Sequence, residues 1–575
     1  MKRLRLTLAQ INPTVGDIRG NTNKIIDYIN KAMELDVDII AFPEMCISGY
    51  PPEDLLMKSR FIDENIEALN EIRKYAGDIV VIVGFVDRKD DIYNALAVIY
   101  KNEIIDIYHK IFLPNYGVFD EMRYFQTGRV IPVYSIGGVT VGVNICEDIW
   151  FPSGPAYKQS LLGAELIINI NASPYAINKA QFKETMLSTR ASDNSAVLAY
   201  VNTVGGQDEL VFDGRSLIID QSGEILYRGK AFKEELLTVD LKIDRLSRLH
   251  DPRRRAEIRG GHKKWDFEAK NIFIHDKSYK SRQSITYSEP KKISVEEEVF
   301  EALVLGTRDY IKKNGFSSVI IGLSGGIDSS VVAAIAVEAI GRDCVKGLFM
   351  PSKYTSKESI ADVKSLAKNL GIEVFTIGIN EIFEDYIYSL RYIFANKLTD
   401  TTEENLQARI RGNLMMAYSN KFGSLVLTTG NKSEMSVGYA TLYGDMAGGF
   451  AVIKDVPKTF IYRLCRWLNE RDGVEIIPQN VLVKEPTAEL KLNQKDSDSL
   501  PPYDELDLVL EAFIEKDCSL EELVSNGMDN ETVKKVIGMV NKSEYKRRQS
   551  PPGIKITRKA FGRDRRMPIT NRYKD

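Results

Sequence analysis

The chain has 575 residues, of which 44% are hydrophobic and 27% are charged, and 77 lysines and arginines nearly balance 80 aspartates and glutamates. This composition is typical of folded globular proteins and excludes a chain that is mostly disordered. The formal net charge of −3 argues against a protein that works mainly on nucleic acid, because such proteins are usually basic.

The sequence also carries information on compartment and on the number of domains. No run approaches ~18 consecutive apolar residues, and the N-terminus has no apolar core of a secretion signal, so neither a membrane span nor export is expected. The five cysteines are scattered, form no CxxC pair and are accompanied by only four histidines, which disfavours a disulfide framework and a structural zinc site. We expect a cytoplasmic protein of two to four domains, at roughly 100–200 residues per domain.

Residues 1–245 alternate short apolar runs with helix-like segments. The runs are rich in Val and Ile and are bounded by polar or turn residues, which is typical of buried strands. They are Val37–Phe42, Ile79–Val86, Val139–Ile145 and Leu166–Ile170, and a helical pattern covers Asn23–Leu35. This alternation predicts an α/β architecture.

Three chemically useful residues each follow a strand-like run of this region. Glu44 follows the first run, Lys110 follows the apolar stretch at 104–107, and Cys146 follows Val139–Ile145. Sites in α/β folds are built at strand ends. Taken singly, each residue is more often structural. Together they make up a thiol nucleophile, a carboxylate base and a cation, which acyl transfer from an amide requires.

This order of Glu, Lys and Cys resembles the carbon–nitrogen hydrolase (nitrilase) family. The run Leu113–Glu121, LPNYGVFDE, is similar to the glutaminase domain that is fused to NAD synthetase. The resemblance implies a nitrilase-like αββα sandwich in residues 1–245. It also implies that Glu44 takes the proton of Cys146, that Cys146 attacks the amide of glutamine, and that Lys110 stabilises the oxyanion.

The same resemblance implies a glutamine-binding set made of Tyr116, Glu147, Ser173 and Lys179. The last position more often holds Arg in the family, so at Lys179 the compact charge of an ammonium group replaces a planar guanidinium. Cys46, two residues after Glu44, is a rival thiol that ranks below Cys146. An alternative remains open, in which the first domain is a non-enzymatic assembly or binding module and the second uses free ammonia.

The pattern changes in residues 246–293. Six cations from Arg253 to Lys264 face one anion, Glu257, without interleaved aromatic residues. This composition favours a solvated interdomain linker over a nucleic-acid patch. A second domain, 294–575, then begins with a helix signal, Ser294 followed three residues later by Glu297. The last thirty residues of the chain are basic.

The strongest single motif lies in this second domain. A strand-like run, Ser318–Leu323, leads into Ser324-Gly325-Gly326-Ile327-Asp328-Ser329, and an apolar helix is expected from Val331. Two glycines let the backbone approach an anion, hydroxyls add donors, and a helix N-terminus favours negative charge. Asp328 can hold a divalent cation, or it can merely cap the helix.

The SGGxDS pattern resembles the loop of the N-type ATP pyrophosphatases, which adenylate their substrate and release pyrophosphate. Further segments are similar to NAD synthetase, and they occur in the order of that family. They are Glu404–Arg411, Thr428–Glu434, Gly438–Asp445, Lys454–Lys458, Lys484–Leu490 and Leu500–Asp504. The resemblance covers most of residues 296–575 and implies a Rossmann-like parallel sheet.

The resemblance to NAD synthetase also implies roles for single residues. Asp328 and Glu434 would hold Mg²⁺. The ATP-binding set would be Ser324, Gly325, Gly326, Asp328, Ser329, Thr429, Lys458 and Thr487, and the deamido-NAD-binding set would be Arg409, Arg411, Glu434 and Asp445. For Arg409 and Arg411, the alternative is that both lie on a solvated helix face.

Both resemblances together imply a glutamine-dependent enzyme of NAD biosynthesis. It would hydrolyse glutamine to glutamate and ammonia, adenylate deamido-NAD with Mg-ATP, and release NAD, AMP and pyrophosphate. We expect small-molecule substrates, a homo-oligomer, and neither nucleic acid nor membrane as partner. The competing enzyme class is a tRNA-thiolating protein with the same loop, although Cys344, Cys465 and Cys518 lie in no recognisable motif.

Overall fold

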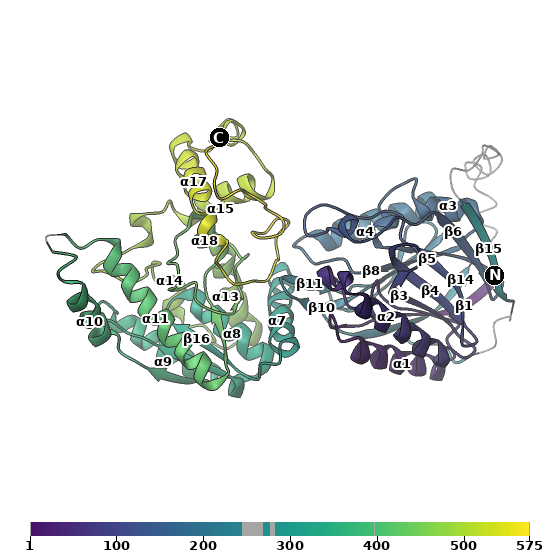
Figure 1. Ribbon diagram of the computed structural model, residues 1–575, viewed down its shortest axis with the longest axis horizontal. Coiled ribbons are helices and arrows are strands. Elements are labelled where there is room, and N and C mark those ends of the chain that lie inside the picture. Colours follow the sequence, from purple (N-terminus) through teal and green to yellow (C-terminus); the bar gives the residue numbers. More distant parts are fainter. Residues whose placement is uncertain (1, 244–267, 277–281, 396, 574–575) are drawn as a thin grey trace. The chain divides into compact units, whose positions relative to one another are not determined.

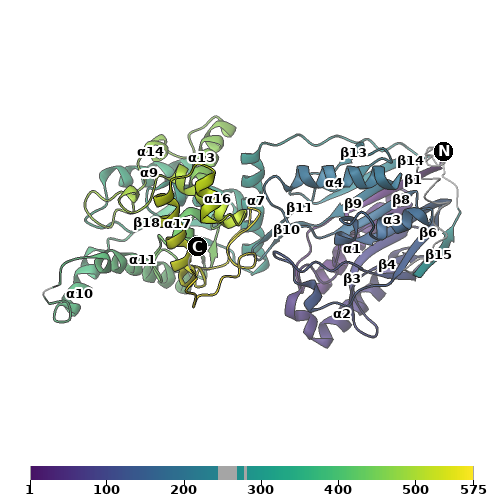
Figure 2. The same ribbon diagram turned by 90° about the horizontal axis from the view of Figure 1, so that it is seen from above.

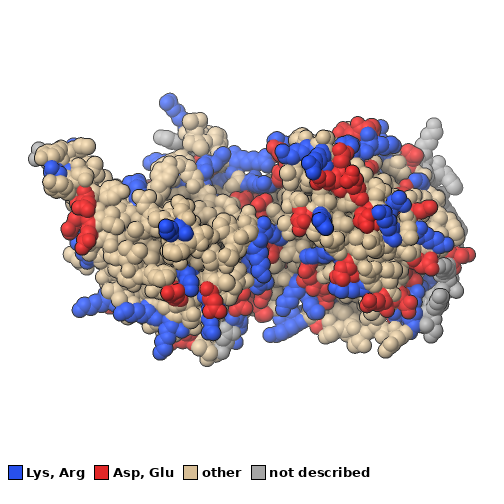
Figure 3. All heavy atoms as spheres, turned by 60° about the horizontal axis from the view of Figure 1, so that its bottom comes forward, with Lys and Arg blue, Asp and Glu red and all other residues tan. Residues whose placement is uncertain are grey.

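The computed structural model describes residues 2–243, 268–276, 282–395 and 397–573. The chain divides into two compact units, one of residues 1–207 and 211–292 and the other of residues 208–210 and 293–575 (Figures 1 and 2). None of the helices in the described ranges is both long and apolar enough to cross a bilayer. On both units, Lys and Arg side chains lie close to Asp and Glu side chains on the face that Figure 3 presents.

The first unit is built on two β-sheets. Among the described residues, a six-stranded sheet has the order β14-β1-β2-β3-β4-β5, and a seven-stranded sheet has the order β13-β12-β9-β8-β7-β6-β15. The strands of the first sheet are β1 (Lys2–Gln10), β2 (Ile39–Ala41), β3 (Val80–Arg88), β4 (Ile92–Tyr100), β5 (Glu103–His109) and β14 (Glu235–Ile243). Those of the second are β6 (Val130–Ile136), β7 (Val139–Ile145), β8 (Leu166–Asn171), β9 (Val197–Asn202), β12 (Leu217–Ile219), β13 (Ile225–Arg228) and β15 (Glu268–His275). A small separate ladder joins β10 (Val204–Gln207) and β11 (Leu210–Asp213).

The core of this unit lies between the two sheets. Leu6 and Val80 of the first sheet belong to one buried apolar cluster with Val141 and Ile168 of the second. Helices cover the outer faces: α1 (Ile18–Glu34) and α2 (Ser59–Ile72) lie on one side, and α3 (Pro155–Leu161) and α4 (Lys179–Asn194) lie on the other (Figure 1). The layers are therefore helix, sheet, sheet and helix, as the sequence predicted.

Two boundaries differ from the sequence-based expectation. Helix α1 begins at Ile18, ahead of the predicted start, because the Asp17 carboxylate caps it by accepting a hydrogen bond from the Gly20 N–H at 2.9 Å. Strand β15 lies in the segment that was predicted to be a linker, and it pairs in parallel with β6 at the edge of the seven-stranded sheet. Its first four residues are exposed and mostly polar, so no strand pattern was visible. The basic run from Arg253 to Lys264 lies outside the described residues.

The second unit carries a five-stranded parallel sheet of order β18-β17-β16-β19-β20 among its described residues. Its strands are β16 (Val319–Leu323), β17 (Val345–Phe349), β18 (Glu373–Thr376), β19 (Leu425–Thr428) and β20 (Phe450–Ala451). The helices are α7 (Val295–Lys313), α8 (Ile327–Ile340), α9 (Lys357–Leu370), α10 (Asn380–Leu390), α11 (Thr401–Phe422), α12 (Lys432–Val437), α13 (Lys458–Asp472), α14 (Gln479–Val483), α15 (Tyr503–Leu510), α16 (Leu520–Ser525), α17 (Asn530–Lys542) and α18 (Glu544–Arg547). This is the Rossmann-like parallel sheet that the sequence predicted.

Two helix starts in this unit bear on the motifs. The Ser294 side chain caps α7 by accepting a hydrogen bond from the Glu297 N–H at 3.1 Å, as predicted. Helix α8 begins at Ile327, four residues before the predicted start. Asp328 therefore lies in the first turn of α8, and Gly326 is the residue that precedes the helix as its cap.

Candidate functional site

Cys146 stands where strand β7 ends, and it opens a short 3-10 helix, Cys146–Ile149. Its φ is +42°, a left-handed value that costs a non-glycine residue about 1–3 kcal/mol. The thiol is buried, and this burial, reinforced by the charge of Glu44, raises the pKa of Cys146 well above its ordinary value. The thiol therefore needs a neighbouring base before it can act as a nucleophile.

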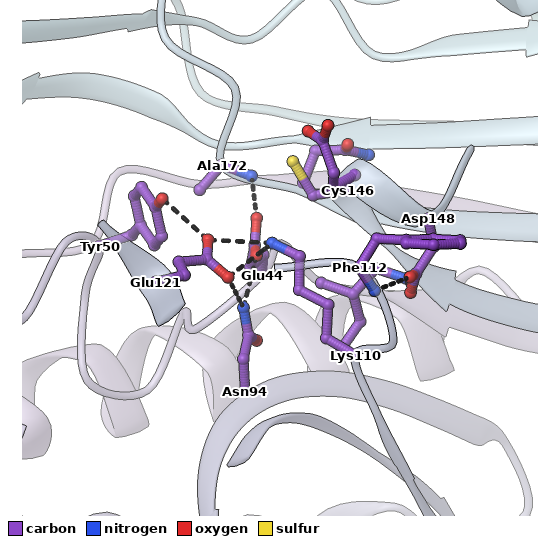
Figure 4. Close-up of polar contacts among 12 residues, drawn as sticks. Glu44, Tyr50, Asn94, Lys110, Phe112, Glu121, Cys146, Asp148 and Ala172 are labelled. Atoms are coloured by element: carbon purple, nitrogen blue, oxygen red, sulfur yellow. Dashed lines mark hydrogen bonds and ion pairs between the residues drawn. The ribbon is translucent and has the colours of Figure 1, made fainter. Parts of the chain in front are cut away.

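Glu44 and Lys110 provide a base and a cation beside this thiol. Glu44 follows β2 and Lys110 follows β5, and the Lys110 Nζ lies 2.7 Å from Glu44 Oε1, with both side chains fully buried. The other oxygen of Glu44 accepts a hydrogen bond from the Ala172 N–H at 2.9 Å. Figure 4 shows the Cys146 sulfur on the side that faces the Glu44 carboxylate and the Lys110 ammonium. The structure thus brings together the three residues that the sequence singled out.

A second carboxylate, Glu121, completes this cluster and was not predicted from the sequence. Lys110 Nζ lies 2.9 Å from the Glu121 carboxylate, which also accepts hydrogen bonds from Tyr50 at 3.0 Å and from Asn94 at 3.2 Å. Burial raises the pKa of Glu121 to about 7, although Lys110 opposes this shift. Burial alone would lower the pKa of Lys110, but the charges of Glu121 and Glu44 outweigh it and raise that pKa well above the ordinary value, so Lys110 stays cationic.

The four residues of the predicted glutamine-binding set fall into two places. The Tyr116 hydroxyl lies 2.9 and 3.0 Å from the two oxygens of Glu147, the residue after Cys146. Burial raises the pKa of Glu147, while Lys110 and Lys179 lower it through their charges. Ser173 is buried, with its N–H bonded to Asn202 Oδ1 at 2.9 Å, and Lys179 donates to the Pro174 carbonyl at 2.8 Å.

Cys46, the rival thiol, is a buried structural residue. Its Sγ donates a hydrogen bond to the Gly84 carbonyl oxygen at 3.5 Å. Burial raises the pKa of Cys46 to about 12. A thiol that is already bonded to a backbone carbonyl and resists ionisation is unsuited to nucleophilic attack.

The second unit contains a cavity of about 310 Å³ at the carboxyl ends of β16 and β19. In an open parallel sheet this is the usual place for a ligand. Eleven of the twelve residues that the sequence analysis assigned to nucleotide or metal binding line it, namely Ser324, Gly325, Gly326, Asp328, Ser329, Arg411, Thr429, Glu434, Asp445, Lys458 and Thr487. Lys484, Tyr439 and Asp496 also line it and were not predicted, although Lys484 begins a segment that carried the resemblance.

The SGGIDS loop forms one wall of this cavity. Gly325 has a φ of +80°, and a Cβ added there would lie 2.7 Å from the Ser359 carbonyl oxygen. The Gly326 N–H donates to Ser324 Oγ at 3.2 Å, and the Ser324 N–H donates to Ser329 Oγ at 3.3 Å. The loop therefore presents small residues and the N-terminus of α8 to the cavity, which suits a phosphate group.

Asp328 and Glu434 lie in the same cavity and share one lysine. The Lys458 Nζ is 2.5 Å from Asp328 Oδ2 and 3.3 Å from Glu434 Oε1, and Asn431 donates to the other Asp328 oxygen at 3.0 Å. Burial raises the pKa of Glu434 to about 8, with Lys458 opposing the shift. Burial alone would lower the pKa of Lys458, but the two carboxylates raise it well above the ordinary value.

The donor set fits Mg²⁺ only with help from a substrate. Within the described ranges, no group of three or more His, Cys, Asp or Glu side chains is arranged to hold a metal. Mg²⁺ is commonly bound by one or two carboxylates together with substrate phosphates and water. Asp328 and Glu434, both facing the cavity beside the phosphate-type loop, match that pattern.

The residues predicted to bind the dinucleotide are only partly brought together. Arg411 lines the cavity, its Nε donates to the Met350 carbonyl at 3.1 Å, and burial lowers its pKa to about 10. Asp445 also lines it, accepts from the Thr441 N–H at 2.7 Å, and has a pKa that burial raises to about 6. Arg409 is not among the lining residues, and its Nε donates to the Leu442 carbonyl at 3.2 Å.

Comparison with known proteins matches each unit and the whole chain. Residues 5–251 match the carbon-nitrogen hydrolase family, and residues 299–550 match the NAD synthase family. The glutamine-dependent NAD(+) synthetase of Thermotoga maritima is 52% identical over 100% of both chains, and that of Aquifex aeolicus is 50% identical over 99% of this chain and 100% of its own. The solved structure of the glutamine-dependent NAD+ synthetase from Acinetobacter baumannii, in complex with adenosine diphosphate, is 40% identical, has a TM-score of 0.76, and covers 99% of each chain.

Proposed function

Because the chain belongs to the family of glutamine-dependent NAD(+) synthetases, we propose which residues perform each half of the reaction. The enzyme releases ammonia from glutamine and uses ATP to convert deamido-NAD into NAD. The observation that carries the assignment is that the chain holds two separate constellations. One is a buried thiol with a base and a cation in the first unit, and the other is a phosphate-type cavity with two carboxylates in the second.

In the first unit, Cys146 attacks the side-chain amide carbon of glutamine while Glu44 accepts the thiol proton. Lys110 stabilises the negative charge that develops on the amide oxygen. The carbon–nitrogen bond then breaks, and ammonia leaves with the proton that Glu44 returns. Water attacks the resulting thioester, glutamate is released, and the Cys146 thiol forms again. Tyr116, Glu147, Ser173 and Lys179 bind glutamine.

In the second unit, the nicotinate carboxylate of deamido-NAD attacks the α-phosphorus of ATP, and pyrophosphate leaves. Ammonia then attacks the acyl carbon, and AMP leaves with formation of the amide. The loop residues Ser324, Gly325, Gly326 and Ser329, together with Lys458, Thr429 and Thr487, orient the triphosphate. Arg411, Asp445 and Arg409 orient the dinucleotide; Arg411 and Asp445 line the cavity, and Arg409 does not.

Mg²⁺, held by Asp328 and Glu434, would neutralise the charge that builds on the departing pyrophosphate. Lys458 contacts both carboxylates, so its ammonium group lies beside the place proposed for the triphosphate. Its own role is to supply a permanent positive charge to the phosphates.

A comparison of two cysteine variants tests the assignment of the nucleophile. Cys146→Ala removes the covalent path, so glutamine-dependent NAD formation should be lost while ammonium-dependent formation persists, because the second site is separate. Cys46→Ala is the matched control and should retain both activities, since it deletes only a buried sulfur at a cost of about 1 kcal/mol in stability. Equal loss with both nitrogen sources in Cys146→Ala would contradict the assignment.

Family membership and the same measurement each test one of the two alternatives that the sequence left open. Family membership argues against the tRNA-thiolating class, because the relatives cover the full chain and share both domains. A first unit that served only as a binding module would give no glutamine hydrolysis in the wild-type chain and no effect of Cys146→Ala.

We also propose a cytoplasmic homo-oligomer. All five cysteines are free thiols, which suits a reducing compartment. Helix α10 has no fully buried residue, and several large apolar side chains on it and just after it are exposed, among them Tyr388, Tyr392 and Ile393. Such a patch favours association between copies. Light scattering coupled to size-exclusion chromatography would reveal a monomer if this is wrong.

A further inference from the structure

Asp148, two residues after Cys146, is buried and accepts four hydrogen bonds. Its Oδ2 accepts from the Tyr108 hydroxyl at 2.7 Å and from the Ile145 N–H at 3.1 Å. Its Oδ1 accepts from the Ile111 N–H at 3.1 Å and from the Phe112 N–H at 2.9 Å. The residue is fully inaccessible, so these donors replace the water that a carboxylate needs.

The four donors belong to the two segments that carry the reacting groups. Ile145 immediately precedes Cys146 on β7, in the seven-stranded sheet. Tyr108 lies two residues before Lys110 at the end of β5, in the six-stranded sheet, and Ile111 and Phe112 directly follow Lys110. The Asp148 carboxylate thus accepts hydrogen bonds from residues on both sides of Lys110 and from the residue before Cys146. Figure 4 shows the bond from Phe112.

Both segments need such a restraint. Cys146 has a left-handed backbone, and residues in that conformation persist only where the surroundings hold them. Lys110 and Cys146 come from different sheets, so the register of their side chains depends on contacts across the interior. An error of about 1 Å between reacting groups can cost about 100-fold in rate.

We propose that Asp148 is a positioning residue for glutamine hydrolysis, and that its carboxylate fixes the Cys146 turn relative to Lys110. Asp148 touches neither glutamine nor the reacting atoms. It acts by holding the nucleophile and the oxyanion-stabilising cation at the distance that the reaction requires. This inference rests on Cys146 being the nucleophile, which the Cys146→Ala variant tests separately.

The chain offers a matched control on the same strand. Asp106 lies two residues before Tyr108 on β5, and it accepts a hydrogen bond at 2.8 Å from Tyr134, a fully buried residue of β6. Asp106→Asn therefore alters an equivalent tyrosine–aspartate bond between the same two sheets, away from Cys146. Any loss that comes merely from loosening the contact between the sheets should appear in both variants.

The experiment compares Asp148→Asn, Asp148→Ala and Asp106→Asn in the full-length enzyme. Three quantities are measured: kcat and KM for glutamine hydrolysis, the rate at which iodoacetamide alkylates Cys146 (followed by mass spectrometry of its peptide), and ammonium-dependent NAD formation. We expect Asp148→Ala to lower kcat about 100-fold, with a smaller effect on KM and slower alkylation. Asp148→Asn, which keeps one acceptor oxygen, should fall in between, and ammonium-dependent synthesis should be unchanged.

The inference is overturned if Asp148→Ala keeps kcat and the alkylation rate within about threefold of wild type, or if Asp106→Asn shows the same losses. If Asp148→Ala does not fold, Asp148→Asn is judged by the same two criteria. Absence of glutamine hydrolysis in the wild-type chain would instead overturn the proposed function, so the two failures are distinguishable.

Discussion

Each of the two sites places a buried lysine between two carboxylates. Lys110 lies between Glu44 and Glu121, and Lys458 lies between Asp328 and Glu434. A buried cation is tolerated only when opposite charges and hydrogen bonds replace its hydration. In both places the lysine stays charged, so each site keeps a fixed positive charge for an oxygen that becomes more negative during the reaction.

Asp328→Asn separates a metal ligand from a helix cap. Gly326 occupies the capping position of α8, so loss of the Asp328 charge should scarcely affect the helix. If Asp328 binds Mg²⁺, NAD formation should fall by about 100-fold or more, which corresponds to about 3 kcal/mol, with glutamine and with ammonium alike. Steady-state rates at several magnesium concentrations provide the measurement.

The control for this variant is Asp362→Asn, which changes a buried carboxylate of the same unit. Asp362 accepts a hydrogen bond from Asn480 at 2.8 Å and does not line the cavity. It should keep near-normal turnover. Near-normal synthesis by Asp328→Asn at low magnesium would refute the metal assignment.

Glu121 should make the stability of the enzyme depend on pH. The pKa of Glu121 is about 7 in the folded chain, above its ordinary value of 4.5. Between these two pH values the folded chain therefore binds a proton that the unfolded chain does not. The associated stabilisation is complete below about pH 4.5 and is lost as the pH rises through about 7; it amounts to roughly 3 kcal/mol. Glu121→Gln cannot titrate and should lack this loss.

Calorimetry at about pH 5 and about pH 8 tests this expectation. The melting temperature of Glu121→Gln relative to wild type should be higher at the upper pH than at the lower. Asp120→Asn, which changes the neighbouring, partly exposed carboxylate, is the control for removing an acid from this segment. A difference between Glu121→Gln and wild type that is the same at both pH values would contradict the expectation.

The buried strands were predictable from the sequence, and the exposed edge strand was not. The run Val139–Ile145 coincides with β7, because a strand that is buried along almost its whole length consists mainly of apolar residues. Edge strand β15 exposes polar residues and left no such trace. Helix α8 begins at Ile327, so the polar Asp-Ser-Ser stretch that was predicted as loop lies within the first turns of the helix.

The candidate sites follow the same rule. Cys146, Glu44 and Lys110 stand out because each ends a recognisable strand. Glu121 begins a single 3-10 turn, Glu121–Arg123, and only the folded chain shows that this acid is buried against Lys110. The role of Asp148 could not be predicted from the sequence either, since its four hydrogen-bond donors lie at or next to the ends of two strands in different sheets.

Gly325→Ala tests the loop between β16 and α8. The backbone there has a φ of +80°, and the new methyl group would meet the Ser359 carbonyl oxygen at 2.7 Å. The loop must therefore shift or adopt a strained backbone, and its N–H groups no longer point toward the phosphates. We expect a raised KM for ATP and about 10- to 100-fold slower NAD formation with either nitrogen source. Gly315→Ala, also at positive φ but in open space, is the control, and an equal effect there would point to backbone strain in general.

The basic C-terminal segment is part of the core of the second unit. Arg547, Lys555 and Arg565 are buried, and Arg547 donates to the carbonyls of α12 residues Met435 and Ser436. Asp455 accepts hydrogen bonds from the backbone N–H groups of Ile556 and Thr557. The C-terminal segment is thus hydrogen-bonded to the helix that carries Glu434 and to the loop before Lys458, both of which lie about a hundred positions earlier in the chain.

Lys432 is the charge at the centre of this arrangement, and Lys432→Met tests it. Its Nζ lies 2.9 Å from Asp455, 2.7 Å from Glu515 and 2.6 Å from the Thr557 hydroxyl, in a buried position. Removing the cation leaves two carboxylates facing each other, at a cost of about 3–5 kcal/mol. We expect a lower melting temperature and slower NAD formation from both glutamine and ammonium, because Glu434 and Lys458 lose their support.

Glutamine hydrolysis at Cys146 should persist, and Lys535→Met, at an exposed position of α17, should behave as wild type. Unchanged ammonium-dependent synthesis in Lys432→Met would show that the C-terminal segment does not hold the second site in place.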